Sequence, residues 1–272
     1  MFMILLMLFS SFLIITIFTI SDFRSETTKG RDVEITIIYD NYPAYENFQG
    51  DWGFSCLIEG KDKTILFDTG TKSEVFSKNL KKLNIDIQSI DFIVISHNHG
   101  DHTGGLPVLA EQSVNAPIYI PSSVSDDFIK YFPSFRNQII VVSDPVEICE
   151  GVLLTGEMGE RIKEQSLLVE TEMGIVVITG CSHPGINIIL DKVTEISDQP
   201  IHLVMGGFHM LDHSSAEIKK IIDQFKFHQV KQCAPSHCAG DKAKQMFKEA
   251  FRENFITLGA GRKIIISNIG QL

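Results

Sequence analysis

Short runs of hydrophobic and polar residues alternate along the chain and predict strands in the first half and strand–helix units in the second. Apolar, β-branched runs of strand length lie at Val33 to Tyr39, Phe54 to Glu59, Thr64 to Phe67 and Asp91 to Ser96. The turn at 60–63 between the second and third runs indicates a hairpin. Further strands are expected at residues 118–120, 139–142, 166–170, 175–179, 202–205, 230–234 and 263–266.

Four segments have the pattern of helices, at residues 73–83, 185–196, 215–228 and 241–251. In the third, Ile218, Ile221, Ile222 and Phe225 fall at positions i, i+3, i+4 and i+7 and form one apolar stripe. Such a stripe is typical of a helix that covers a sheet. We therefore predict an α/β domain over residues 33–272, with two mixed β-sheets packed together and helices outside.

The first residues follow a different pattern. Residues 1–20 contain no charged side chain, and twenty helical residues span roughly 30 Å, enough to cross a bilayer. We expect an N-terminal hydrophobic helix that anchors the protein in a membrane, followed by a linker at 21–32. Basic residues in this linker favour a catalytic domain on the cytoplasmic side. The alternative is a signal peptide, after whose cleavage the protein is exported.

Composition narrows the classes of function. The formal net charge is −10 and the isoelectric point is about 5.3, so we expect no nucleic-acid partner, because an acidic surface repels a phosphate backbone. The five cysteines are odd in number, and the chain is long, so a disulfide framework is not expected.

The sequence SHNHGDHTGGL, which begins at Ser96, carries the strongest chemical signal. On an extended segment, His97 and His99 point the same way and converge on one metal ion. Gly100 permits a turn, which lets Asp101 and His102 face a second site. Imidazole and carboxylate suit zinc most, and also manganese or iron. The sequence therefore predicts one or two divalent metal ions, and a merely solvated histidine-rich turn fits this pattern poorly.

A third ligand for the first metal has to come from further along the chain. A catalytic metal usually has three protein ligands and one open position. His183, in TGCSHPG, is the first histidine after His102 and follows an expected strand. We therefore expect His183 to complete the first site.

The pattern H-x-H-x-D-H after a short apolar strand is the signature of the metallo-β-lactamase superfamily, which the chain resembles in HNHGDH and in ILFDTG at 65–70. The resemblance implies a four-layer αββα sandwich, with Asp68 buttressing the metal loop and His237 as the last ligand of the second metal. Many members have a bridging aspartate where this chain has Cys181. Two roles are open for Cys181: a thiolate ligand or an inert residue beneath the site.

More narrowly, the chain resembles the branch of that superfamily that includes the archaeal dihydropterin synthase of methanopterin biosynthesis. The residues that carry this resemblance are Asp40-Asn41, WGFSCLI, TGCSHPGI, GGFH and PSHCAG. The synthase couples a pterin diphosphate to ribofuranosylaminobenzene phosphate and releases pyrophosphate. Other relatives in this branch are regarded as metal-dependent hydrolases.

From these features we expect an enzyme that hydrolyses a small ester or phosphodiester through a metal-bound hydroxide. Its substrate is a small molecule, with phosphorylated compounds among the candidates. The catalytic residues would be Asp101 and His209, with His209 contacting a substrate phosphate or acting as general acid. Glu164 is a further residue expected near the metals. The alternatives are the pterin-coupling transferase and a non-catalytic metal or redox sensor.

Overall fold

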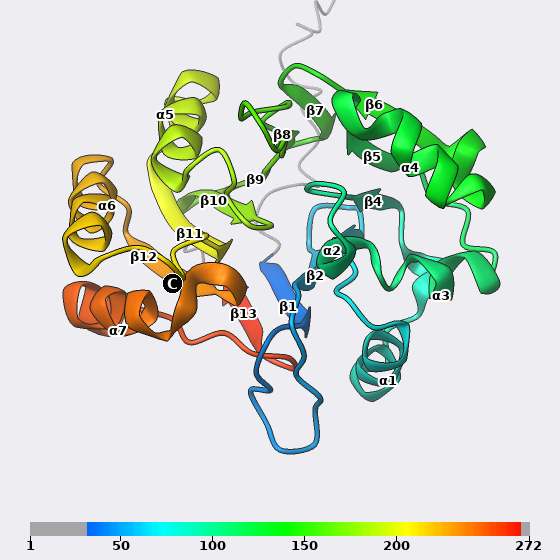
Figure 1. The fold of residues 1–272 in the computed structure, drawn as a ribbon, viewed down its shortest axis with the longest axis horizontal. Helices are drawn as coiled ribbons and strands as arrows, with labels where there is room; N and C mark the ends of the chain where they lie inside the picture. Colours follow the sequence, from blue (N-terminus) through cyan, green and yellow to red (C-terminus); the bar gives the residue numbers. More distant parts are fainter. Residues whose placement is uncertain (1–31, 268–272) are drawn as a thin grey trace, which may run out of the picture.

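Two packed β-sheets form the centre of the computed structural model, which describes residues 32–267 (Figure 1). The first sheet has the strand order β13-β1-β2-β3-β4-β5-β6. Its strands are β1 (Val33–Tyr39), β2 (Ser55–Glu59), β3 (Ile65–Phe67), β4 (Phe92–Val94), β5 (Ile118–Pro121), β6 (Ile139–Val142) and β13 (Lys263–Ile266). β1 to β3 and β13 pair antiparallel, whereas β3 to β6 run parallel, so the sheet is mixed.

The second sheet has the order β12-β11-β10-β9-β8-β7 and is also mixed. Its strands are β7 (Val146–Cys149), β8 (Val152–Leu154), β9 (Leu167–Thr171), β10 (Gly174–Thr179), β11 (Ile201–Gly207) and β12 (Gln232–Ser236). β10, β11 and β12 are parallel, and the others pair antiparallel. The parallel strands place the loops that follow them at one end of the sheet.

Helices cover the outer face of each sheet (Figure 1). They are α1 (Ser73–Leu83), α2 (Gly100–Thr103), α3 (Leu106–Glu111), α4 (Ser125–Tyr131), α5 (Ile186–Ile196), α6 (Ser215–Phe227) and α7 (Gly240–Phe251). α1, α3 and α4 pack on the first sheet, and α5, α6 and α7 pack on the second. The short helix α2 lies in the loop that carries the histidine cluster.

Burial of apolar side chains explains why the four layers hold together. Between the sheets, residues such as Ile35, Ile37, Val176 and Ile178 are fully buried. Two further clusters fill the spaces between each sheet and its helices. All six residues of β10 are buried, as expected for a strand covered on both faces. The expected fold, two mixed sheets with helices outside, is therefore confirmed.

One part of the expectation is corrected. Along residues 32–267, none of the helices has the length and apolar character needed to cross a membrane, so the predicted membrane-anchored localisation is wrong on this finding. The expectation of an N-terminal hydrophobic helix or signal segment rested on residues 1–20, and the linker on 21–32. These residues, except the last, lie outside the part of the chain that the structure describes.

Candidate metal centre

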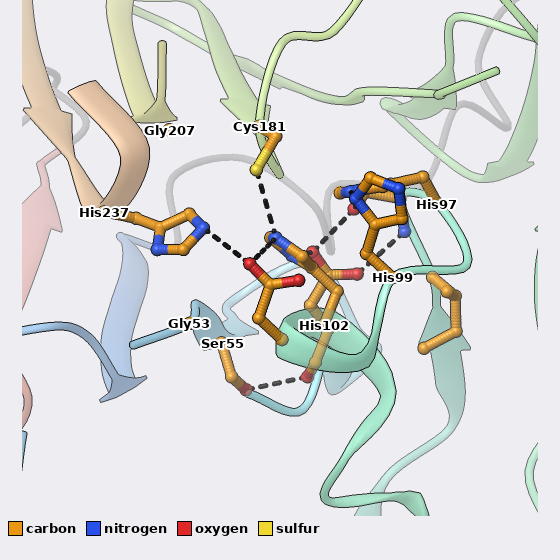
Figure 2. Close-up of polar contacts among 12 residues, drawn as sticks. Gly53, Ser55, His97, His99, His102, Cys181, Gly207 and His237 are labelled. Carbon is orange, nitrogen blue, oxygen red and sulfur yellow. Dashed lines mark hydrogen bonds and ion pairs between the residues drawn. The ribbon is translucent and has the colours of Figure 1, made fainter. Parts of the chain in front are cut away.

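Histidines from three separate loops meet where the two sheets adjoin, and Figure 2 shows His97, His99 and His102 of the first loop, Cys181 of the second and His237 of the third. His97, His99 and His102 follow β4, His183 follows β10, and His237 follows β12. The ring centroids of His97 and His183 are 4.8 Å apart, and those of His102 and His237 are 5.1 Å apart. The structure therefore brings together all the histidines that the sequence proposed as ligands.

The loop after β4 has two parts, an extended segment and a single helical turn. His97 is buried, and its Nε2 lies 3.0 Å from Nδ1 of His99. His99 has extended backbone angles and precedes α2, which begins at Gly100. This single helical turn places Asp101 and His102 side by side, and His102 Nε2 lies 3.7 Å from Asp101 Oδ2. The alternation and the turn that the sequence predicted are both present in the backbone.

Asp68 supports this loop from the side that faces away from the proposed metal site. Its buried carboxylate accepts hydrogen bonds from the backbone N–H of Ser96 at 2.7 Å and from Ser96 Oγ at 2.7 Å. It also lies 2.6 Å from Nδ1 of His102. Because the carboxylate holds Nδ1, it leaves Nε2 of His102 directed toward Asp101 and Cys181.

Glu164 is placed differently from the expectation that it approaches the metals. Its buried carboxylate accepts hydrogen bonds from the backbone N–H groups of Cys181, Ser182 and His183, at 2.9, 2.9 and 2.8 Å. Burial raises the pKa of Glu164, and these three amides oppose that rise. Glu164 therefore fixes the turn that presents Cys181 and His183. Ser182 within this turn has a φ of +64°.

His237 is held from the side opposite His102. Its Nδ1 lies 3.0 Å from Oδ1 of Asn41, and the amide nitrogen of Asn41 donates to the His237 carbonyl at 3.1 Å. Its Nε2 lies 3.2 Å from Asp101 Oδ2, which also accepts a hydrogen bond from Trp52 Nε1 at 2.9 Å. The rings of Trp52 and His237 are 4.6 Å apart.

Sequence reasoning assigned no role to Asn41 or Trp52. The signals were present in the sequence, because Asn41 closely follows the first strand and Trp52 is the one tryptophan of the chain. Their function depends on contacts with residues far along the chain. Asn41 and His237 are 196 positions apart.

Cys181 lies between the histidine groups, and its Sγ is 3.3 Å from Nε2 of His102 (Figure 2). A hydrogen bond with Cys238 and burial both raise the pKa of the Cys181 thiol. Cys238 is buried beside it and accepts a hydrogen bond from the backbone N–H of His209 at 3.3 Å. His209 is exposed at the rim, and its ring centroid lies 4.4 Å from that of His183.

Burial and neighbouring charges set the protonation of the histidines. Burial lowers the pKa of His97 well below its usual value and that of His183 to about 4, so both are neutral at pH 7. Burial also opposes the charged form of His102, but the Asp68 carboxylate outweighs it and raises the pKa to about 9. A metal that binds here therefore contacts His97 and His183 as neutral imidazoles, whereas His102 first has to lose a proton.

The donor set fits divalent metal ions. Three groups have ligand atoms that lie within 4.8 Å of one another: Asp101, His102, Cys181 and His237; His97, Cys181 and His183; and Cys181, His209 and Cys238. Cys181 belongs to all three groups, whereas His99 belongs to none of them and faces His97. Among residues 32–267, the buried Nε2 of His183 has no hydrogen-bond partner, which is costly unless a ligand satisfies it.

Comparison with known proteins agrees with the fold. The family model described as the metallo-beta-lactamase superfamily matches residues 53–220. The chain therefore belongs to the metallo-β-lactamase superfamily. This membership implies that the site binds divalent metal.

Two relatives come from Methanocaldococcus jannaschii. The 7,8-dihydropterin-6-methyl-4-(β-D-ribofuranosyl)-aminobenzene-5'-phosphate synthase is 31% identical, over 86% of this chain and 96% of its own length. An uncharacterized protein is 30% identical, over 85% of this chain and 99% of its own length. Among solved structures, a metal-dependent hydrolase of the β-lactamase superfamily is 29% identical, with a TM-score of 0.72, covering 87% of this chain and 100% of that one.

Proposed function

We propose that the chain is a metal-dependent transferase of the dihydropterin synthase type, which couples a pterin diphosphate to an aminobenzene-derived phosphate and releases pyrophosphate. The observation that carries this proposal is the 31% identity to the synthase over nearly the full length of both proteins. Hydrolysis was the first expectation from the sequence, and the comparisons favour the transferase over it.

The metal centre supplies the chemistry that this reaction needs. A bound divalent metal would place positive charge on the phosphate oxygens of a leaving diphosphate. Asp68, Glu164 and Asn41 orient the ligand side chains through the hydrogen bonds described above. Fixed ligands favour such electrostatic stabilisation, because they need no reorganisation during the reaction.

His209 is the side chain best placed to act on the substrate. It is exposed at the rim, next to His183. A hydrogen bond with Cys238 raises the pKa of His209, although burial opposes the rise. A protonated imidazole at this position can donate a hydrogen bond or a proton to a phosphate oxygen of the leaving group.

Hydrolysis of an ester or phosphodiester is the second candidate. It is favoured by the solved structure of a metal-dependent hydrolase at 29% identity. The two functions use the same metal ligands and differ in the nucleophile, which is water in one case and the amine of a phosphorylated aminobenzene compound in the other. Substrates therefore separate them better than mutations do.

The direct test is to incubate the protein, loaded separately with zinc, manganese and iron, with the pterin diphosphate and ribofuranosylaminobenzene phosphate. Release of pyrophosphate together with the coupled pterin product supports the transferase. Cleavage of model phosphodiesters without formation of that product would instead assign the hydrolase.

Replacement of a proposed ligand tests the metal centre itself. We expect His99→Ala to lower the metal content and to reduce the rate by more than about 100-fold, because loss of a ligand exceeds the effect of losing a supporting contact. Metal analysis and initial rates measure both. The matched control is His202→Ala. His202 lies at the end of β11 opposite the loop that carries His209, and this variant is expected to keep both its metal content and its rate. Unchanged metal content and rate in His99→Ala would contradict the assignment.

A further inference from the structure

A cavity of about 520 Å³ lies beside Asp40 and Ser236, the residues that precede Asn41 and His237 in the chain. Its walls come from the loop after β1, the end of β12, the first turns of α7 and the segment that precedes β13. Figure 1 shows α7, β12 and β13 on one side of the molecule, near the loop after β1. A cavity of this size matches sites for small organic molecules, which range from about 300 to 1,000 Å³.

The floor of the cavity is connected through the backbone to Asn41 and His237. Asp40 and Ser236 are buried there and share a short hydrogen bond from the Ser236 hydroxyl to the Asp40 carboxylate. The next residue after each of them, Asn41 and His237, forms the hydrogen bond that orients the His237 ring. The floor of the cavity is therefore next to the metal centre along the backbone.

The rim of the cavity carries one cation, Arg262, in addition to an ion pair. Arg262 is exposed, and no carboxylate within the described range, residues 32–267, pairs with its guanidinium group. Lys244 also lines the cavity; it pairs with Asp241 at 2.7 Å, and its Nζ lies 4.5 Å from the centre of the Tyr42 ring. A guanidinium without a partner offers a fork of donors that suits a phosphate or carboxylate group.

Four apolar side chains also line the cavity. They are Pro43, Pro235, Phe255 and Leu258, and Leu258 is 8% exposed. Flat apolar rings fit such walls, because proline and phenylalanine side chains present broad faces. A ligand complementary to both the apolar side chains and Arg262 has an aromatic ring against the former and an anionic group at the guanidinium.

We propose that this cavity binds an aromatic small molecule that carries a phosphate, with its ring among Pro235, Phe255 and Leu258 and its phosphate at Arg262. This assigns the second substrate its own site beside the metals, and for that identity it rests on the proposed function. The ring end of the molecule then lies on the floor of the cavity, against Asp40 and Ser236.

The test uses the full-length, zinc-loaded protein and phenyl phosphate as the probe, with inorganic phosphate and benzoate as separate arms, in isothermal titration calorimetry. Burial of a ring predicts that phenyl phosphate binds at least about tenfold more tightly than inorganic phosphate. Arg262→Ala is expected to weaken phenyl phosphate at least about tenfold. Benzoate distinguishes a general site for aryl anions from one that requires phosphate.

Two matched variants locate the binding. Lys263→Ala removes a neighbouring cation that pairs with Glu34 outside the cavity, and is expected to leave affinity unchanged. Thr257→Phe fills the cavity from an exposed position and is expected to weaken the probe as Arg262→Ala does. Phosphate bound at the zinc centre is common to all variants and cancels in the comparison. Thermal melting checks that each variant is folded.

The outcomes separate this proposal from the proposed function. Equal affinity for phenyl phosphate and inorganic phosphate, or unchanged binding in both Arg262→Ala and Thr257→Phe, would overturn the cavity as a binding site. Binding that depends on Arg262, in a protein that forms no pterin product, would support the cavity and reject the synthase reaction.

Discussion

Asp68 is not one of the proposed metal ligands, but its carboxylate sets the protonation of the ligand His102. The residue is fully buried and has a φ of +52°, a backbone conformation that few residues other than glycine adopt. Its carboxylate holds Ser96 and His102 at 2.6 to 2.7 Å. The local strain is offset by these three charge-assisted hydrogen bonds.

The substitution Asp68→Asn should weaken metal binding about 10- to 100-fold, as is usual when the partner of a ligand is lost. The carboxylate raises the pKa of His102 to about 9, so metal binding below that pH displaces a proton. Metal affinity of the unmodified protein should therefore rise with pH up to about 9. In Asp68→Asn, metal binding at pH 8 should release about one proton fewer.

Calorimetry in buffers of different ionisation enthalpy measures this proton release. The matched control is Asp91→Asn, which removes a carboxylate that pairs with Lys63 away from the metal centre. If Asp68→Asn and the unmodified protein released the same number of protons, the proposed coupling between Asp68 and His102 would be wrong.

At the level of secondary structure, α6 shows how a helix is fixed on the second sheet. Ser214 and Glu217 form a capping box at its first turn. Phe225, on its buried face, packs against Phe208, Phe247 and Phe251, with ring centroids 5.0 to 6.1 Å apart. These contacts join α6, α7 and the loop after β11, which carries His209.

Truncation of this cluster should destabilise the fold more than it affects the site. Phe225→Ala is expected to lower the free energy of unfolding by about 3–5 kcal/mol, because it leaves a cavity in a closely packed cluster. Phe227→Ala, two residues further along and 74% exposed, should change it by less than about 0.5 kcal/mol. Urea denaturation of both variants measures the difference. Equal effects would show that the cluster does not stabilise α6.

The sequence predicts the strongly patterned elements well. The strand Val33–Tyr39 and the helix Ser73–Leu83 have the predicted bounds, because alternation and a single apolar stripe mark them clearly. The hairpin β7–β8 and the helices α3 and α4 were not predicted. β7 is half-exposed, and α4 begins with a run of charge, so neither has a regular apolar pattern.

The candidate site is likewise only partly predictable from the sequence. The ligand residues are recognisable from the sequence because four of them share one short motif and the others follow predicted strands. The supporting contacts of Asn41, Trp52 and Glu164 depend on which strand ends meet in space. No local pattern encodes that proximity, so only the structure identifies these contacts.

On the scale of the whole molecule, the metal site links the two sheets. His97, Asp101 and His102 extend from the first sheet, and His183 and His237 extend from the second. The unfolded chain keeps only the four groups of residues 97–102 close together, so a metal that binds the complete set in the folded state more tightly stabilises that state. At a metal concentration of 100 times the dissociation constant, this stabilisation is about 2.7 kcal/mol.

Metal loading should therefore raise the melting temperature by roughly 5–10 °C for a chain of this size. Differential scanning calorimetry with zinc, and again after removal by a chelator, measures the shift. His183→Ala and His237→Ala should each reduce it, and His202→Ala should leave it intact. A melting temperature that does not respond to any divalent metal would contradict a site that bridges the sheets.

The position of Trp52 gives the molecule its own optical probe. It is the one indole in the chain, it donates to Asp101, and its ring lies 4.6 Å from that of His237. A cation bound to those two side chains changes the field around the indole and its hydrogen bond. The emission spectrum should therefore shift as the ion enters and return when it leaves, so that occupancy can be followed in real time without any label.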